Sequence, residues 1–189
     1  MHRYCSIKEQ ARHVRSAQPA EVFAAVGITG DYLDRAFALA QAGAAGICVD
    51  VAHGHHVTAL QAIIDLRDNH PDLHIMAGNV ATLEAFNDLA DAGADSIRVG
   101  IGGGSICSTR IKTGHGIPTF QSVLECARSD RDALLIADGG IKNTGDMVKA
   151  LAAGADAVMI GSMLAGTRET PGNVIAVPGG EPRKVYRGM

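Results

Sequence analysis

The chain has 189 residues, of which 47% are hydrophobic, 20% charged and 4% aromatic, and its formal net charge is -3 at pH 7. This balance lacks the basic excess of a nucleic-acid-binding protein, and the apolar runs are too short to cross a membrane. The length is sufficient for one globular domain with a sizeable core, so we expect residues 1–189 to form a single domain.

Cysteine usage and the N-terminal sequence indicate a cellular compartment. The four cysteines show no C-x-x-C spacing, which is typical of free thiols in a reducing environment; they are Cys5, Cys48, Cys107 and Cys126. The opening sequence "MHRYCSIKEQARHVRS" lacks the long apolar segment of a signal peptide. We therefore expect a cytoplasmic protein.

A helix-glycine-strand repeat organises the chain. Three copies of Ala-Gly-Ala each follow a helical stretch and precede an apolar run, within residues 41–50, 91–100 and 152–161. Glycine adopts a positive φ without penalty and commonly ends helices. Each copy therefore predicts a helix, a glycine stop, a short turn and a buried strand.

Further segments fill the intervals between the copies, after "HRYCS" at 2–6, which has the pattern of a strand end. In chain order the predicted strands are 22–28, 47–50, 73–80, 97–100, 133–141 and 158–161. The predicted helices are 7–14, 32–42, 56–70, 83–92, 120–129 and 145–153. This alternation predicts a parallel α/β sheet, formed as a (β/α)8 barrel or as an open doubly wound sheet.

Glycine and polar residues follow each predicted strand. They are Gly27, Asp50 with His53, Asn79, the segment 100–107, Asp138 with Gly139 and Gly140, and Gly161 with Ser162. Both barrels and open α/β sheets place their active sites at the carboxyl ends of the strands. We therefore expect these residues to share one site.

Several long motifs follow one another in one order. They are "HRYCSIKEQ", "VDVAHGHH", "MAGNVAT", "RVGIGGGSICSTR", "KTGHGIP", "IADGGIKNTGDMVKALAAGADAVMIGSMLAGT" and "YRGM". In these motifs the chain resembles the IMP dehydrogenase and GMP reductase family. The family has a (β/α)8 TIM barrel, so the resemblance implies a catalytic barrel that is incomplete in this chain, with strands 3 to 8 present. The chain is also shorter than the roughly 250 residues of a typical barrel.

Cys107 is the candidate nucleophile. A lone cysteine with apolar neighbours is commonly a core thiol, but this one lies in a glycine-rich segment after a predicted strand. The resemblance implies that its thiolate attacks C2 of a purine and that Thr109 assists. It also implies a monovalent cation, K+, on the carbonyls of Gly102, Gly104 and Cys107. Arg110 is a candidate to pair with phosphate or to fix the loop.

The resemblance also implies a nucleotide site and a cofactor site. The substrate residues are Asp138 for the ribose hydroxyls, the phosphate-binding Gly139, Gly140, Gly161 and Ser162, and in addition Ser105, Tyr186, Gly188 and Met189. The residues expected near the nicotinamide are Asp50, Asn79, Arg98 and Gly100. Without the resemblance, Asp138 reads equally as a turn residue and Asn79 as a structural hydrogen-bonding residue.

Two sequence features depart from a simple assignment. The pair Pro118-Thr119 stands where the family commonly has Pro-Gln, which weakens any transfer of base contacts made there. The histidines of "HGHH" lack the carboxylate or cysteine spacing of a zinc site, which favours a solvated loop over a metal centre; they are His53, His55 and His56.

The last expectation concerns which of the family's two reactions the chain catalyses. The string Lys112-Thr113-Gly114 and "SVLECA" are more similar to GMP reductase, whereas "KVYRGM" and "LAGTRETPG" are more similar to IMP dehydrogenase. We expect NADPH-dependent reductive deamination of GMP to IMP, with NAD-dependent oxidation of IMP to XMP as the alternative. A non-catalytic nucleotide-binding module and an unrelated flavin-dependent barrel are alternatives of other classes. The resemblance also implies a homotetramer that binds a purine nucleotide and NADP(H) or NAD.

Overall fold

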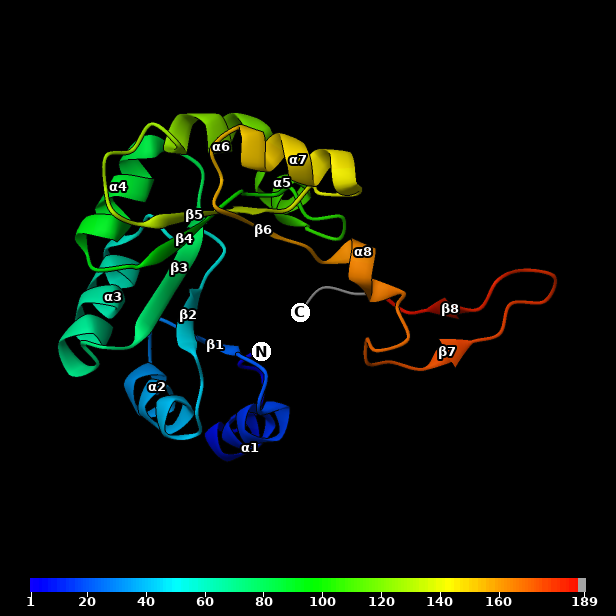
Figure 1. Cartoon of the computed structure of the whole chain (residues 1–189), viewed down its shortest axis with the longest axis horizontal. Helices are drawn as coiled ribbons and strands as arrows, with labels where there is room; N and C mark the ends of the chain where they lie inside the picture. Colours follow the sequence, from blue (N-terminus) through cyan, green and yellow to red (C-terminus); the bar gives the residue numbers. More distant parts are fainter. Residues whose placement is uncertain (187–189) are drawn as a thin grey trace.

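Six parallel strands form the centre of the structure, and the computed structural model describes residues 1–186. The strands pair in sequence order and are β1 (Phe23–Val26), β2 (Gly46–Asp50), β3 (His74–Val80), β4 (Ser96–Val99), β5 (Leu134–Asp138) and β6 (Ala157–Met159). A doubly wound sheet reverses its strand order at a switch point. The sequential order and the curled sheet (Figure 1) therefore confirm the predicted partial (β/α)8 barrel.

Helices lie along the convex side of this sheet (Figure 1). The long ones are α1 (Ile7–Ala17), α2 (Tyr32–Gln41), α3 (Val57–Asn69), α4 (Leu83–Asp91), α6 (Thr119–Cys126) and α7 (Thr144–Ala152). Each predicted strand and helix is present, with ends shifted by a few residues. The short helices α5 (Thr109–Thr113) and α8 (Ser162–Ala165) and the pair β7 (Val174–Ile175) and β8 (Arg183–Lys184) were not predicted.

The repeated glycines end their helices as the sequence predicts. Gly43, Gly93 and Gly154 follow α2, α4 and α7 with φ angles of 89°, 106° and 108°. An aspartate after two of these glycines then binds the preceding strand. Asp95 Oδ2 accepts the backbone N–H of Ile75 at 2.6 Å, and Asp156 Oδ2 accepts that of Leu135 at 2.7 Å. In these two copies, the aspartate therefore fixes the turn to the strand before it.

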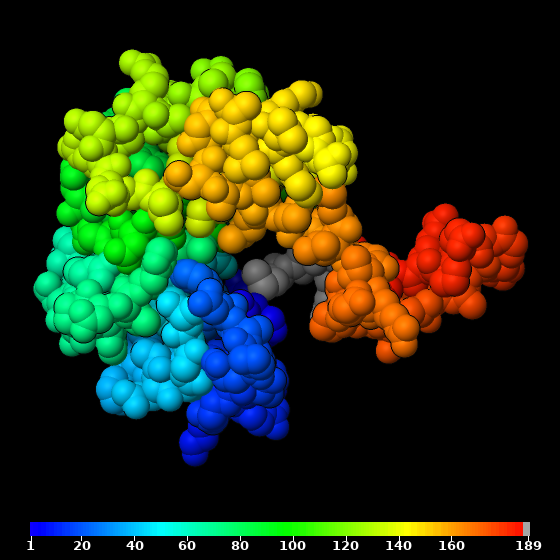
Figure 2. Space-filling model, viewed as in Figure 1, coloured from blue at the N-terminus to red at the C-terminus, as the bar shows by residue number. Residues whose placement is uncertain are grey.

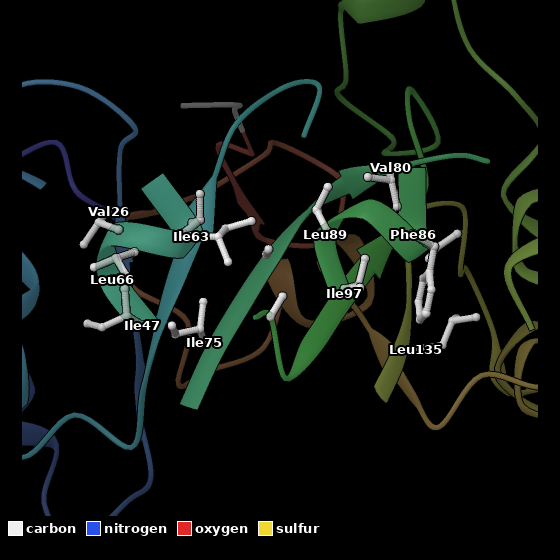
Figure 3. Packing of buried hydrophobic residues seen from close by; sticks show 14 of the residues in the cluster. Val26, Ile47, Ile63, Leu66, Ile75, Val80, Phe86, Leu89, Ile97 and Leu135 are labelled. Carbon is white, nitrogen blue, oxygen red and sulfur yellow. The ribbon is translucent and has the colours of Figure 1, made fainter. Parts of the chain in front are cut away.

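The main core lies between the sheet and its helices (Figure 3). Its large side chains are at most 3% exposed and are Val26, Ile47, Ile63, Leu66, Ile75, Val80, Phe86, Leu89, Ile97 and Leu135. A smaller cluster, which contains Cys48, Met76 and Ile136, lies on the concave face. Burial on both faces explains why the strands read as nearly continuous apolar runs.

Two segments flank the sheet. At the N-terminal side, the backbone N–H of Ala25 donates to the Met1 carbonyl at 2.8 Å, so the chain start lies beside β1 as a strand neighbour would. At the other side, the antiparallel β7–β8 hairpin projects from the body (Figures 1 and 2). The space-filling view shows the body as an open curve around a hollow (Figure 2). Among residues 1–186, no helix combines the length and apolar character that a membrane span needs.

The core packing gives a first prediction. Phe86 on α4 is 1% exposed, so Phe86→Ala should lower the free energy of unfolding by about 3–5 kcal/mol through lost burial and a residual cavity. Phe37→Ala on α2 is the matched control, because that side chain is 57% exposed and its loss should cost below about 1 kcal/mol. Urea unfolding monitored by circular dichroism measures both. Equal losses in the two variants would contradict the packing described here.

Candidate active site

A charged network joins the ends of four strands, β2, β3, β4 and β5, on the concave face. Arg98 at the end of β4 is 7% exposed, and its Nη2 donates to Asp50 Oδ1 at 2.6 Å. Its Nη1 lies 3.7 Å from Asp138 Oδ2. Asn79 Nδ2 donates to that same carboxylate oxygen and to the Gly100 carbonyl, both at 2.8 Å. The structure therefore brings together the residues that the sequence placed on the cofactor side.

Gly78 makes room for this network. It lies opposite Asp50 on β2 and opposite Arg98 on β4. A β-carbon on Gly78 would lie 2.8 Å from the Arg98 Cβ, so a side chain at this position would collide with Arg98. Burial by itself works to lower the pKa of the Arg98 guanidinium, but Cys48, Asp50 and Asp138 outweigh that effect and raise the pKa. Arg98 is therefore a fixed positive charge between two carboxylates.

Cys107 lies on the loop between β4 and α5, partly exposed. Its Sγ is 3.3 Å from the Thr109 Oγ1. This hydroxyl, with the backbone N–H of Thr109, lowers the pKa of the Cys107 thiol because both favour the thiolate, and the nearby charge of Arg110 acts in the same direction. The segment 96–124 contains no Asp or Glu. The loop therefore has the surroundings of a reactive thiol.

The two buried thiols, Cys48 and Cys126, have their pKa shifted in the opposite direction to that of Cys107. Burial raises the pKa of Cys126 to about 12 and also raises the pKa of Cys48. Both side chains are at most 8% exposed. Of these three cysteines, Cys107 is the one whose environment favours a nucleophile.

The loops after β4 and β5 touch backbone to backbone. A β-carbon on Gly100 would lie 2.0 Å from the Asp138 carbonyl oxygen, and one on Gly139 would lie 3.0 Å from the Gly104 amide nitrogen. Gly100 and Gly139 also have φ angles of 143° and 90°. Only glycine satisfies both conditions, so these residues let the Cys107 loop lie directly against the end of β5.

A small cavity of about 120 Å³ opens where these loops meet β6. Its lining contains seven of the nine predicted substrate residues, namely Ser105, Asp138, Gly139, Gly140, Gly161, Ser162 and Tyr186. A β-carbon on Gly161 would lie 3.1 Å from the Tyr186 hydroxyl, so the segment after β8 returns to the sheet edge. The other two predicted residues, Gly188 and Met189, lie outside the described residues.

A larger cavity of about 680 Å³ borders the end of the Cys107 loop at Thr109. Its wall includes Thr109 together with Ala52, His53, Thr82, Ile101 and the segment 113–117. The sequence did not predict the contribution of His115 and its neighbours, because nothing in their spacing places them beside β2 and β3. Gly104 lines the small cavity, and a β-carbon there would meet the Cys107 Cβ at 3.5 Å. The Cys107–Thr109 pair therefore borders both cavities, Thr109 directly and Cys107 through its neighbour Gly104.

The remaining histidines of "HGHH" have separate roles. His55 Nε2 lies 2.8 Å from Asp88 Oδ2, and His56 Nδ1 accepts the backbone N–H of Thr58 at the start of α3. Over residues 1–186, no group of three His, Cys, Asp or Glu side chains is placed to hold a metal ion. A third cavity, of about 790 Å³, is lined by residues of α6 and α7 and by Gly103, Arg110, Thr119, Gly139 and Gly140, so two of the predicted phosphate-binding glycines border it as well.

Comparison with known proteins agrees with this arrangement. A sequence model described as the IMP dehydrogenase / GMP reductase domain matches residues 1–189. The chain belongs to this family. Among its curated relatives is the inosine-5'-monophosphate dehydrogenase of Nitrosopumilus maritimus (strain SCM1), which is 48% identical over 170 residues, 89% of this chain and 36% of that protein. The enzyme of the same name from Bacillus subtilis (strain 168) is 50% identical over 170 residues, covering 89% of this chain and 35% of that protein.

Solved structures of both branches of the IMP dehydrogenase / GMP reductase family resemble the chain. An inosine 5'-monophosphate dehydrogenase from Legionella pneumophila matches with a TM-score of 0.91 and 50% identity, over 100% of this chain and 58% of that one. A variant GMP reductase from Trypanosoma brucei in complex with guanosine 5'-monophosphate matches with a TM-score of 0.86 and 44% identity, over 89% of this chain and 36% of that one. The chain spans about a third of the length of the curated relatives named above.

The thiol environment gives a prediction that needs no substrate. Because the pKa of Cys107 is lowered, its alkylation by iodoacetamide should reach half of its maximal rate at a lower pH than that of an ordinary cysteine. Thr109→Val removes the hydroxyl that favours the thiolate. This should raise the midpoint and slow the reaction several-fold at pH 7, with rates that converge at high pH.

Peptide mass spectrometry measures alkylation at Cys107 separately from that at Cys126, which should react slowly. Thr109→Ser keeps the hydroxyl and is the matched control. An unchanged midpoint in Thr109→Val would show that the hydroxyl does not set the thiol pKa.

Proposed function

We propose that this site reduces GMP to IMP with NADPH, through a covalent adduct between Cys107 and C2 of the purine. The observation that carries the proposal is that the Cys107–Thr109 pair borders two cavities. One cavity collects the residues expected to bind the nucleotide, and the other borders Thr109. Hydride transfer needs two ligands that meet at one carbon atom, and this geometry supports that requirement.

The residues that line the small cavity match the ribose and phosphate of a nucleotide in their chemistry, although its volume of about 120 Å³ is smaller than a whole nucleotide needs. The Asp138 carboxylate can accept two ribose hydroxyls, while Gly139, Gly140 and Gly161 offer backbone N–H groups to a 5'-phosphate. Loops after the last two strands of a (β/α)8 barrel commonly bind phosphate in this way. Ser162 begins α8 and adds a hydroxyl. With ribose and phosphate bound there, the purine extends toward the Cys107 loop.

Cys107 then acts at C2 of the bound purine. Its thiolate forms the Sγ–C2 bond, and the exocyclic amino group leaves C2 as ammonia after it takes up a proton. Thr109 is the hydroxyl nearest the sulfur and is the candidate to pass protons at this position. The nicotinamide supplies a hydride to C2. Cleavage of the Sγ–C2 bond returns the thiolate and releases IMP.

The larger cavity suits a nicotinamide cofactor. Its volume of about 680 Å³ is within the range of about 300–1,000 Å³ that is typical of cofactor sites, and it opens on Thr109. Ile101, Ala81 and Ala85 give it apolar walls, and His53 and His115 give it polar ones. Asp50 and Asn79 stand at the neighbouring strand ends. These residues would hold the cofactor with its reactive ring toward the purine.

IMP dehydrogenase activity is the second candidate, with NAD as the oxidant. The observation in its favour is that the two curated relatives described above carry that name. Both reactions form an adduct between Cys107 and C2 of the purine. In the reduction of GMP, ammonia leaves and a hydride is added to C2, whereas in the oxidation of IMP a hydride is removed from C2 and water attacks the adduct. Cys107 is the candidate nucleophile for either reaction.

The decisive test measures both reactions on the same protein. GMP with NADPH, and IMP with NAD, are followed by absorbance of the reduced nicotinamide. We expect turnover with GMP and NADPH, and we expect Cys107→Ala to abolish it while nucleotide binding, measured by calorimetry, changes less than about threefold. Full activity of Cys107→Ala would exclude the mechanism. Binding of GMP without turnover in either of the two assays would identify a nucleotide-binding module.

The nucleotide cavity has a test of its own. Asp138→Asn removes the charge that accepts the ribose hydroxyls, so the affinity for GMP should fall at least about tenfold, equivalent to about 1.4 kcal/mol. Asp132→Asn changes an exposed carboxylate just before β5 and is the matched control. Calorimetric titration with GMP and with guanosine measures both variants. A loss of affinity shared equally by Asp132→Asn would contradict a ribose contact at Asp138.

Other expectations stay predictions. The Gly104 carbonyl accepts the backbone N–H of Cys107 at 3.1 Å, which shapes the loop on which a K+ ion is expected, with Gly102 and Cys107 as the further ligands. The homotetramer and the preference for NADP(H) over NAD rest on the resemblance, and the cytoplasmic location rests on the cysteine usage and the N-terminal sequence.

A further inference from the structure

Arg110 occupies a narrow slot between two glycines of different segments. A β-carbon on Gly102 would lie 2.6 Å from the Arg110 Cγ, and one on Gly116 would lie 2.6 Å from the Arg110 Nε. Real β-carbons do not approach other atoms so closely. The arginine stem therefore passes through a space that exists because neither neighbour has a side chain.

The far end of Arg110 fastens the second segment. Its Nη2 donates to the Ile117 carbonyl at 3.0 Å. Its own carbonyl accepts the backbone N–H of Gly114 at 3.0 Å, where the chain reverses with a φ of 70°. One residue thus contacts the loop that precedes Cys107, the turn after α5, and the segment 116–117.

The two segments joined by Arg110 belong to different parts of the site. Gly102 lies on the loop between β4 and α5 that carries Cys107. Gly116 and Ile117 line the cavity of about 680 Å³. A change in the position of one segment must therefore displace the other or break the contacts of Arg110.

We propose that Arg110 is a positioning residue that latches the Cys107 loop to the wall of the larger cavity. The inference deepens the proposed function and rests on it for its catalytic meaning, since it assigns the residue that orients the nucleophile relative to the cofactor cavity. It also decides between the two roles that the sequence left open for Arg110, because the residue fixes the loop.

Charge alone is a weaker explanation for Arg110. Its side chain is exposed, so solvent and salt screen its attraction for the thiolate. The other charged or titratable groups of the surrounding elements are Lys112 on α5, His115 on the following turn, Arg98 on β4, Asp138 at the end of β5, and Lys142, Asp146 and Lys149, which line the same cavity of about 790 Å³ as Arg110. A latch and a charge make different predictions for a variant that keeps the guanidinium but closes the slot.

Gly116→Ala is that variant. Gly116 does not have a positive φ, so the backbone tolerates alanine, and the new methyl group collides only with the Arg110 side chain. We expect Gly116→Ala and Arg110→Ala each to slow alkylation of Cys107 several-fold at pH 7, because the loop that presents the thiol is then no longer held in place. The double variant should equal Arg110→Ala, because the methyl group then meets no side chain. Gly166→Ala is the control, since nothing lies within 4 Å of its added β-carbon.

The experiment uses the intact chain, iodoacetamide as the probe and mass spectrometry of the Cys107 peptide, with urea unfolding to confirm that each variant folds. A wild-type response in Gly116→Ala would leave charge as the role of Arg110 and overturn the latch. Additive effects in the double variant would also overturn it, because the two residues would then act independently. The assay contains no nucleotide, so its failure is distinct from an absence of turnover by the wild-type chain.

Discussion

The contact between the backbones after β4 and β5 is the constraint on which the rest of the site depends. The Asp138 carbonyl would lie 2.0 Å from any β-carbon at Gly100, a separation that no side chain permits. Two loops that carry different functional groups can therefore pack as closely as two main chains allow. The loop that carries Cys107 therefore lies directly against the strand end that carries Asp138. The main role of glycine in these loops is to let the two backbones approach closely, and its conformational flexibility is secondary.

The same principle operates in the strands themselves. Gly78 leaves a gap on the concave face of β3, and Arg98 reaches across it from β4 to Asp50 on β2. A guanidinium that is 7% exposed needs such partners, because an unpaired charge at that depth is strongly unfavourable. With Asn79 and Asp138, the network keeps the ends of four strands, β2 to β5, in fixed positions before any ligand binds. Much of the rigidity that oriented chemistry requires is therefore built into the sheet.

The sequence was most informative where the chain repeats a local rule. The three Ala-Gly-Ala copies predicted helix ends that the structure places at Gly43, Gly93 and Gly154, because a positive φ depends on one residue alone. The order of the strand ends also predicted that Asp138 and Gly161 would meet. The slot of Arg110 was not predictable from the sequence. It requires Gly102 and Gly116, which are fourteen positions apart in the sequence, to lie on either side of one side chain. His115 enters its cavity through that same convergence.

The hairpin has a consequence for how the small cavity is completed. The chain leaves this cavity at Ser162 and re-enters it at Tyr186, and none of the residues between them line it. Closing such a loop costs entropy that grows only slowly with its length. Lys184 Nζ donates to the carbonyls of Thr167 and Thr170 at 2.7 and 2.5 Å, which shortens the loop that must close. The projecting part can therefore vary in length and composition over evolution while the tyrosine keeps its place.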